Sequence, residues 1–568
     1  FAMAMPAALE AACSERSLVA RLVRAVLPSR IAALAIVLVG FAAIAITFAA
    51  AHYGPTIDEG AHIAAGMQWL DQGRYAYEPS TPPLARIADA LGPYLTGARS
   101  TFNPDMWHEG DDILRSAGNP AAMLALARLG TLVFLLLAAG AIWRWSCRLG
   151  GEPTALCALA LFLALPPILA HGGLATTDMA AAATFTLAML ATMRWLERPD
   201  LYRSLALGAA AALMVLSKFT VFLFFPTALA PVLIWRLWVG GDRRQPIQHW
   251  LYGAAFALLA AAVVIWSGYR FSVGSLGYEP ALVGQHIAAA AAHPSSGVAA
   301  TIAKLPIYPA HEFVRGIFDT TRRVDAHRDP VYLLGQLSQG GLWYFFPVDL
   351  IAKTPLPFLI AAALGMVMLV RRSRALRDWR IAAPALAAFG VLAGSMASPV
   401  DFGIRYLLPI YPLLAIAAGT ALLALARGKG WDKVTACVLV LWASADSVTA
   451  FPDYLPWFNA LAGQAPQAVA INSDLDWGQD VKRLDQKVRA LGIHRIHVAV
   501  LEQSEYDLRA YIAGYEKLPP SERVGGWIAV SQYMLHEQPG YAWLRAYTPV
   551  ATVGSSILLY HLPENIDG

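Results

Sequence analysis

Long apolar runs separated by polar connections dominate this chain. A transmembrane helix requires about 20 mostly apolar residues, and runs of this kind, some of them shorter, lie near residues 31–51, 122–146, 153–170, 179–197, 203–217, 219–238, 249–268, 344–370, 381–398, 405–426 and 432–450. The pattern predicts a polytopic α-helical membrane protein with about eleven spans. The fifth and sixth runs are short and meet at Lys218, so one kinked helix is the alternative to two spans.

The distribution of Lys and Arg favours two spans. If the N-terminus is cytoplasmic, basic residues gather in alternate connections, such as the one from Arg194 to Arg203. This pattern requires residues 204–238 to cross twice with Lys218 outside, and an odd number of spans then places the C-terminus outside. We therefore expect a cytoplasmic N-terminal segment, a transmembrane domain with two long external connections, and an external tail, at residues 1–30, 31–450 (connections 52–121 and 269–343) and 451–568.

The tail has a different pattern from the rest of the chain. Residues 468–471 form a short apolar run typical of a strand, and residues 480–491 have apolar positions at helical spacing. Residues 495–501 read as a second strand, which completes a βαβ unit. A further helix near 504–515 and strands near 527–532 and 555–562 predict a small α/β domain.

Composition narrows the possible classes. Hydrophobic residues make up 57% of the 568 residues and charged residues 14%, a balance that supports a membrane protein. The net charge of +4 is too small for a nucleic-acid binder of this size, so we expect no nucleic-acid partner. The four cysteines lie in the N-terminal segment or in or beside apolar runs, so we expect no disulfide framework.

An acidic pair, Asp58 and Glu59, follows the first apolar run directly. Ionisable side chains at the end of a span are costly and therefore suggest function. On a helix the two side chains diverge by about 100 degrees, so only one faces a given cleft. Two readings of Asp58 stay open: a general base that takes a proton from an acceptor hydroxyl, or a cap of a helix that begins near Gly60.

The surrounding motifs resemble a known superfamily. The acidic pair, Gly73-Arg74-Tyr75 and Pro82-Pro83-Leu84 share one connection, which resembles the signature of the GT-C glycosyltransferases that use polyprenyl-phosphate sugars, the protein O-mannosyltransferase and aminoarabinose transferase superfamily. The resemblance is clearest over residues 31–240, and the segments 401–409 and 472–480 are similar to bacterial members. It implies a multi-pass enzyme of the bacterial inner membrane with a periplasmic tail. It also implies a polyprenyl-phosphate sugar donor, contact with membrane lipid, and a glycan, lipid or protein acceptor.

The resemblance assigns roles to the acidic residues. Asp58 corresponds to the catalytic base, with Glu59 as its support, and Asp178 to a second acidic residue near the active site. Read alone, Asp178 follows two threonines at the start of a span and is typical of a helix cap. With the resemblance, it positions Asp58, an acceptor, or a metal ion held by Asp58 and Asp178. No His-rich or Cys-rich spacing indicates zinc, so dependence on a divalent metal stays open, and no other cofactor is expected.

A phosphate leaving group calls for cationic side chains at the membrane surface. The candidates are Arg128, which resembles a membrane-embedded Arg of the mannosyltransferases, and Lys218, Arg405, Lys353 and Arg86. The alternative for Arg128 is a side chain that snorkels to the interface, and the alternative for Lys218 and Arg405 is an ordinary interfacial anchor. The sequence departs from the superfamily at Thr81, where the aminoarabinose transferases have Lys and the mannosyltransferases His; Arg86 is a candidate replacement.

Weaker candidates for contact with acceptor or sugar are His62, Tyr75, Tyr344, Asp474, Asp476, Trp477 and Gln479. In the tail, a sugar could stack on the Trp477 indole; the alternative is a loop in which Trp477 packs underneath. The main rival function is a transporter or flippase of a lipid-linked or small-molecule substrate. Transporters often contain internal repeats and helices broken near the membrane midplane, whereas here the acidic pair lies in a connection and no repeat is visible.

Overall fold

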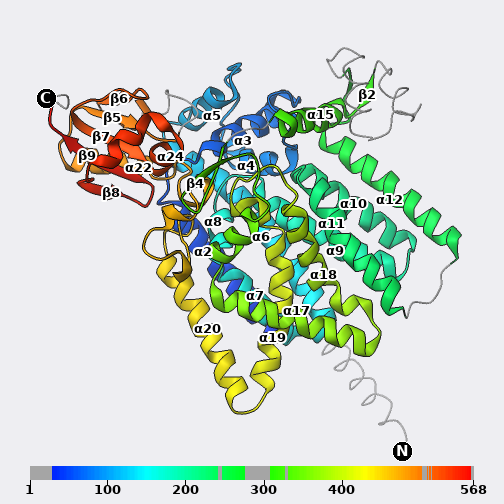
Figure 1. Ribbon diagram of the computed structural model, residues 1–568. Helices are drawn as coiled ribbons and strands as arrows, with labels where there is room; N and C mark the ends of the chain where they lie inside the picture. Colours follow the sequence, from blue (N-terminus) through cyan, green and yellow to red (C-terminus); the bar gives the residue numbers. More distant parts are fainter. Residues whose placement is uncertain are drawn as a thin grey trace, which may run out of the picture.

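The structure is a computed structural model that describes residues 29–240, 246–275, 307–326, 330–501, 508–509, 511–512 and 514–564. Its apolar helices form a bundle, and a small sheet domain lies at one end of it (Figure 1). In the described part of the chain, eight helices are long and apolar enough to cross a membrane: α2 (Arg30–Ala50), α6 (Pro120–Gly150), α9 (Asp178–Glu197), α11 (Val221–Val239), α12 (Ile247–Gly268), α17 (Leu356–Leu376), α19 (Ile410–Arg427) and α20 (Trp431–Ala450).

Three shorter apolar helices complete the set: α7 (Glu152–Leu163), α10 (Leu201–Ser217) and α18 (Trp379–Ser395). Together with the eight long helices they correspond to the predicted apolar runs, so the predicted helical membrane class is confirmed. The fifth and sixth runs form two separate helices, α10 and α11.

Prolines break two of the predicted runs. The run at 153–170 divides into α7 and α8 (Pro166–His171), and the run at 344–370 divides into α16 (Phe345–Lys353) and α17. Proline lacks an N–H donor and disfavours helical conformation in the residue before it. The prediction of one continuous helix over 344–370 is therefore wrong, and Lys353 lies at the end of a short helix.

The connection after α2 folds into three helices, α3 (Ile57–Met67), α4 (Pro83–Leu95) and α5 (Met106–Arg115), at the same end of the bundle as the sheet domain (Figure 1). The π-helical turn η1 (Gln68–Gln72) extends α3. Helices α3 and α4 cross in close contact at Gly66, where a Cβ atom would lie 1.9 Å from the carbonyl oxygen of Arg86. Only glycine fits at this crossing.

The second long connection contributes short elements at that end of the bundle. They are β1 (Val273–Gly274) paired with β2 (Tyr308–Pro309), helix α15 (His311–Ala326), and the hairpin of β3 (Pro330–Leu333) and β4 (Gln336–Gln339). After α18, the 3-10 turn η2 (Ile404–Leu407) leads into α19.

The tail forms a five-stranded mixed sheet in the order β6 (Tyr515–Lys517), β5 (Ile496–Ala499), β7 (Gly526–Ser531), β9 (Ile557–Leu562) and β8 (Ala551–Val553). Strand β5 is parallel to β6 and β7, whereas β9 is antiparallel to β7 and β8. Helix α22 (Val481–Ala490) precedes the sheet, and α24 (Gln532–Glu537) and η5 (Pro539–Ala546) follow β7. The predicted small α/β tail domain is confirmed.

One predicted strand of the tail is absent. After η3 (Ala460–Ala462), residues 468–471 run from the last residue of η4 (Pro466–Ala468) to the start of the short helix α21 (Asn472–Leu475). They form no strand, so the predicted βαβ unit is wrong. Ala470 and Ile471 are buried, and Ala470 packs in the core of the helical bundle. A run of four apolar residues has no periodicity that separates a strand from another buried segment. Most of the helix expected near 504–515 lies outside the described residues.

Candidate active site

A buried ion pair fixes the start of α3. The Nε and Nη2 groups of Arg128 each donate to a carboxylate oxygen of Glu59 at 2.7 Å, and Glu59 also accepts from the backbone N–H groups of Thr56 at 2.8 Å and Ala175 at 2.9 Å. Burial alone would raise the pKa of Glu59, but the Arg128 charge and these hydrogen bonds lower it. The pair therefore joins α3 to α6 and to the segment before α9.

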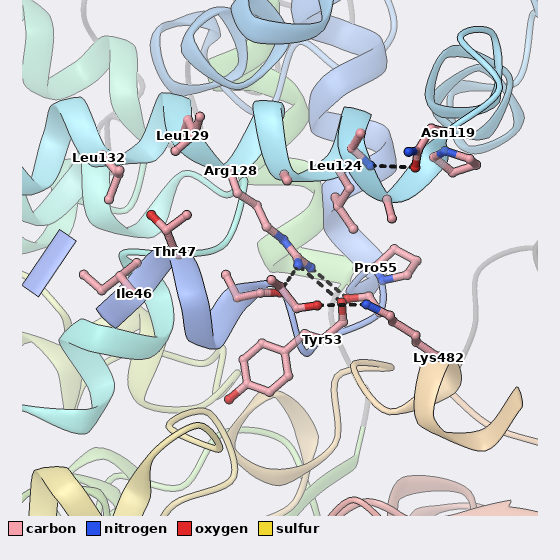
Figure 2. Close-up of a pocket in the computed structure, with 18 of the residues that line it drawn as sticks. Ile46, Thr47, Tyr53, Pro55, Asn119, Leu124, Arg128, Leu129, Leu132 and Lys482 are labelled. Carbon is pink, nitrogen blue, oxygen red and sulfur yellow. Dashed lines mark hydrogen bonds between the residues drawn. The ribbon is translucent and has the colours of Figure 1, made fainter. Parts of the chain in front are cut away.

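Arg128 has no donor left for a ligand. Besides Glu59 it donates to the carbonyl oxygens of Ala50 at 2.6 Å, Gly54 at 2.7 Å and Tyr53 at 3.4 Å, which engages all five N–H groups (Figure 2). Phosphate binding by Arg128 would first have to break these bonds. This geometry favours a structural role, and phosphate binding by Arg128 stays an untested prediction.

Arg128 also borders a groove between α2 and α6 with a volume of about 340 Å³ (Figure 2). Apolar side chains such as Ile46 and Leu132 line it, and Lys482, whose Nζ donates to the carbonyl oxygen of Ala51 at 2.8 Å, lies at one end. The residues around this groove do not include Asp58 or Arg405. It is therefore separate from the ionic cluster described next.

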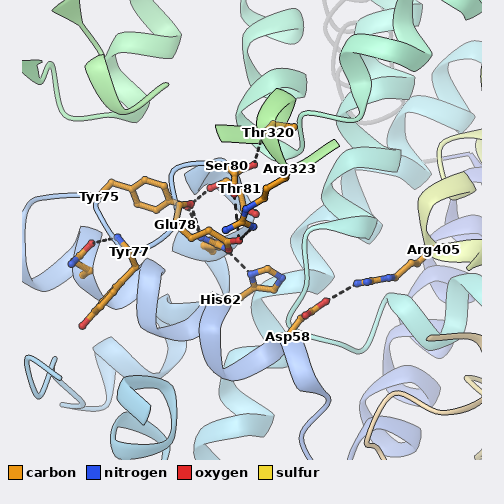
Figure 3. A network of polar contacts seen from close by, with 12 residues as sticks. Asp58, His62, Tyr75, Tyr77, Glu78, Ser80, Thr81, Thr320, Arg323 and Arg405 are labelled. Carbon is orange, nitrogen blue, oxygen red and sulfur yellow. Dashed lines mark hydrogen bonds and ion pairs between the residues drawn. The ribbon is translucent and has the colours of Figure 1, made fainter. Parts of the chain in front are cut away.

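Asp58 forms an ion pair with Arg405. The Nη1 group of Arg405 lies 2.6 Å from Oδ2 of Asp58 (Figure 3), although the two residues are 347 positions apart in the chain. The cap of α3 is Thr56, so Asp58 does not serve as the cap. The Asp58 side chain is 25% exposed, against 0% for Glu59, so the two neighbours face different surroundings.

Arg405 keeps donors that no described residue uses. Its Nε donates weakly to the Phe402 carbonyl at 3.3 Å, whereas no hydrogen-bond partner in the described part of the chain faces its Nη2 group. Burial disfavours the charged guanidinium, but the carboxylates of Asp58 and Asp178 outweigh this and raise the pKa of Arg405 above its ordinary value. Arg405 is thus a charged group with donors available to a ligand.

A second ion pair, between Asp178 and Lys218, lies beside the first. The Lys218 Nζ lies 2.5 Å from Oδ1 of Asp178 and 3.9 Å from the ring centroid of Tyr406. Oδ2 of Asp178 is buried with no hydrogen-bond partner in the described residues. Asp178 is the first residue of α9, and Thr177 occupies the cap position. The structure thus brings together four residues that the sequence nominated: Asp58, Asp178, Lys218 and Arg405.

Both carboxylates of this cluster have a cationic partner. Within the described ranges, no group of three or more His, Cys, Asp or Glu side chains is arranged to hold a metal ion. Metal dependence stays an open prediction.

Arg86 is the centre of a separate, buried network (Figure 3). Its Nε donates to Nδ1 of His62 at 2.9 Å and its Nη1 to the Tyr75 hydroxyl at 3.1 Å, and it forms an ion pair with Glu78. Tyr75 in turn donates to the Thr81 carbonyl at 2.5 Å. Arg86 is fully buried and engaged within the first connection, an arrangement that does not favour its predicted replacement of a side chain at position 81.

The same network binds α15 to the first connection. Arg323 pairs with the second oxygen of Glu78, and the Thr320 hydroxyl donates to the Ser80 carbonyl at 3.2 Å (Figure 3). Glu78 therefore bridges Arg86 and Arg323. The sequence reading did not single out Glu78, although its position three residues before Thr81, within the motif, was a usable signal.

The tautomer of His62 follows from its partner. Because Arg86 can only donate, Nδ1 of His62 must accept, which places the proton of the neutral ring on Nε2. Burial and the Arg86 charge lower the pKa of His62 to about 4. His62 lies one turn after Asp58 on α3 and presents a neutral N–H donor.

We expect His62 to make the protein less stable as pH falls. The folded-state pKa of about 4 is below the ordinary 6.5, so the stabilisation is complete above pH 6.5 and is lost as pH falls towards 4. Thermal unfolding in detergent at pH 7.5 and pH 5.0 measures this loss. His62→Asn keeps an acceptor for Arg86 but does not titrate, so its melting temperature should fall less over this interval; equal falls would contradict the assignment.

The remaining candidates are mostly buried and engaged by the protein. The Nζ group of Lys353 donates to the carbonyl oxygens of Leu455 and Asp474, both at 2.7 Å, which favours a structural role over phosphate binding. Tyr344 lies at the start of α16, half-buried. Trp477 is 2% exposed, and Gln479 bonds within its own loop, so the geometry favours the reading in which Trp477 packs underneath. The sequence reading also missed His171, whose ring centroid lies 5.9 Å from that of Trp477.

The comparisons with known proteins bear on this site. A family model described as dolichyl-phosphate-mannose-protein mannosyltransferase matches residues 123–266, which include Arg128, Asp178 and Lys218. The likeness to this mannosyltransferase family is confined to that segment. The match confirms the predicted resemblance and the predicted enzyme class, a GT-C type glycosyltransferase.

Solved structures with a similar course of the chain include ArnT from Cupriavidus metallidurans bound to undecaprenyl phosphate, with 13% identity, 92% of this chain and 97% of that chain covered, and a TM-score of 0.47. Another is the archaeal oligosaccharyltransferase AglB from Archaeoglobus fulgidus in complex with an inhibitory peptide and a dolichol-phosphate, with 11% identity, coverage of 94% and 74%, and a TM-score of 0.46. No curated protein matches the sequence.

Proposed function

We propose that the protein transfers a sugar from a polyprenyl-phosphate donor to an acceptor hydroxyl, with inversion, on the periplasmic side of the bacterial inner membrane. The observation that carries this proposal is the convergence of two carboxylates and two cations, Asp58 with Arg405 and Asp178 with Lys218. The N-terminus is then cytoplasmic, and the sheet domain is periplasmic because it lies at the same end of the bundle as the cluster (Figure 1).

Asp58 is the base in this proposal because it is the most exposed member of the cluster and an acceptor can reach it. The acceptor oxygen attacks the anomeric carbon from the face opposite the phosphate, and its proton passes to the Asp58 carboxylate. The bond from the anomeric carbon to the phosphate oxygen breaks, and the polyprenyl phosphate leaves with the electron pair. One displacement of this kind inverts the configuration.

The cations meet the charge that develops on the leaving phosphate. Fixed donors aimed at such a charge stabilise the transition state more than the ground state. Arg405 offers its unused Nη2 donors, and Lys218 lies beside it over the ring of Tyr406. His62 and the unpartnered oxygen of Asp178 supply one donor and one acceptor for the sugar or the acceptor.

The test is transfer by the purified full-length protein from radiolabelled polyprenyl-phosphate sugars to acceptors in a membrane extract. We expect label in the acceptor fraction, and NMR of the product should show inverted configuration at the anomeric carbon. Transfer with retained configuration would overturn the single displacement. Absence of transfer with every donor, together with substrate-dependent flux in vesicles, would favour the transporter.

A further inference from the structure

The segment 472–480, which we call the tail linker, connects the helical bundle to the sheet domain and contacts the chain next to Asp58. The carbonyl oxygen of Trp477 accepts from the backbone N–H of Ile57 at 3.2 Å, and that of Gln479 accepts from Gly54 at 2.8 Å. Ile57 is the residue before Asp58. The tail linker therefore holds the segment that carries the proposed base.

The tail linker also holds the turn that carries Arg405. Oδ1 of Asp474 accepts from the backbone N–H of Ile404 at 2.9 Å, and the Ser473 hydroxyl donates to the Phe402 carbonyl at 2.5 Å. Between them, Gly403 has φ +83, and a Cβ atom there would lie 2.6 Å from Oδ2 of Asp474. The close fit fixes the backbone immediately before Arg405.

A third contact acts on the Arg405 side chain itself. The guanidinium carbon of Arg405 lies 4.3 Å from the Trp477 ring centroid, and the indole is 2% exposed. A guanidinium over an indole face is attracted by the ring, more strongly where water is excluded. Trp477 thus restricts the guanidinium on one of its faces.

The buried end of the tail linker is anchored independently. Lys353 donates to the Asp474 carbonyl at 2.7 Å, and its charge lies among the buried carboxylates of Asp349 and Asp474. In the described residues both oxygens of Asp349 lack hydrogen-bond partners, and Lys353 is the cationic neighbour of this side chain. The position of Asp474 is therefore set by Lys353 as well as by Ile404.

From these contacts we infer that Asp474 and Trp477 are positioning residues that place the Arg405 guanidinium between Asp58 and the phosphate of the donor, so that these two residues of the tail linker support the active site. This inference rests on the proposed function. It links the segments 401–409 and 472–480, which the sequence had marked separately.

Binding of undecaprenyl phosphate to the purified full-length protein tests the inference, with undecaprenol as the ligand that lacks the phosphate. Trp477→Leu and Asp474→Ala should each weaken binding of the phosphate by about tenfold, the scale of one lost cation–π contact or hydrogen bond to a charged group. Binding of undecaprenol should not change. Trp477→Phe keeps an aromatic face and should stay within about threefold of the wild type.

Asp476→Asn is the matched control. Asp476 lies in the same tail linker and is equally buried, but its carboxylate accepts from the Tyr533 N–H at 2.9 Å in the sheet domain and, among the described residues, does not bond to Arg405 or Ile404. We expect this variant to lose thermal stability and to bind undecaprenyl phosphate like the wild type. If Asp476→Asn and Asp474→Ala weaken binding of undecaprenyl phosphate equally, the effect is general destabilisation and the inference is overturned.

A double-mutant cycle with Arg405→Ala keeps the test valid if the single variants are unstable. Positioning residues have nothing left to position once the guanidinium is gone, so Trp477→Leu should add no further weakening in the Arg405→Ala protein. Fully additive losses would contradict the inference. Wild-type protein that does not distinguish undecaprenyl phosphate from undecaprenol would instead contradict the proposed function.

Discussion

Asp58→Asn should lower the rate of sugar transfer by about three orders of magnitude, the range measured for removal of a general base. The asparagine has nearly the same shape, and its carbonyl oxygen can still accept from Nη1 of Arg405, which now lies 2.6 Å from Asp58. The ability to take the acceptor proton is lost, and the ion pair with Arg405 becomes a hydrogen bond to a neutral amide. Donor binding should therefore stay close to that of the wild type.

Single-turnover transfer and donor binding, measured on the same preparation, separate the two steps. Asp112→Asn is the control, because Asp112 lies in the same connection, is half-buried, and accepts from Asn103 at 3.1 Å away from the cluster. Wild-type transfer by Asp58→Asn would remove Asp58 as the base. Equal losses of transfer and donor binding would instead reassign Asp58 to holding Arg405.

Glu59→Gln should destabilise the protein by about 3–5 kcal/mol, the usual cost of leaving one partner of a buried ion pair without the other. Glu59 is fully buried and Arg128 is 5% exposed, so water cannot compensate the orphaned guanidinium. Thermal unfolding in detergent measures the loss. Glu59→Gln combined with Arg128→Met should recover part of it, since no unpaired charge remains.

Arg148→Met provides the matched control for this prediction. The pair of Arg148 and Glu197 is partly exposed, with 40% of the Arg148 side chain accessible, and its loss should cost about 1 kcal/mol or less. A Glu59→Gln protein of normal stability that fails to bind donor would contradict the structural role. It would mean that Glu59 positions Arg128 for the phosphate, the role that the sequence alone suggested for Arg128.

The helices were predictable because apolar length is a local property of the chain. The breaks before Pro166 and at Pro355 were visible in the sequence as prolines, yet a window average over 153–170 or 344–370 conceals them. The error at residues 468–471 arose because that run is too short for its pattern to identify the element. Four apolar residues were read as a strand, whereas only Ala470 and Ile471 are buried, and Ala470 packs in the core of the helical bundle.

The site was predictable in its membership but not in its pairing. Asp58, Asp178, Lys218 and Arg405 could be nominated because each lies at the same end of its span or connection. Helical geometry also required Asp58 and Glu59 to face different surroundings. No local pattern, however, indicates that Arg128 pairs with Glu59. Nor does one indicate that Arg405 pairs with Asp58, 347 positions away, and keeps donors that no described residue uses. Such partners are set by tertiary packing alone.

The contact at Gly66 determines which parts of the site can move. Because a Cβ atom there would lie 1.9 Å from the Arg86 carbonyl, α3 and α4 touch backbone to backbone. Turning α3 about its axis would drive the neighbouring side chains, Ala65 and Met67, into the same space. The backbone of Asp58 therefore has a fixed position and direction relative to the bundle. A substrate therefore approaches a carboxylate on a fixed backbone, and any adjustment at Asp58 is confined to rotation of its own side chain.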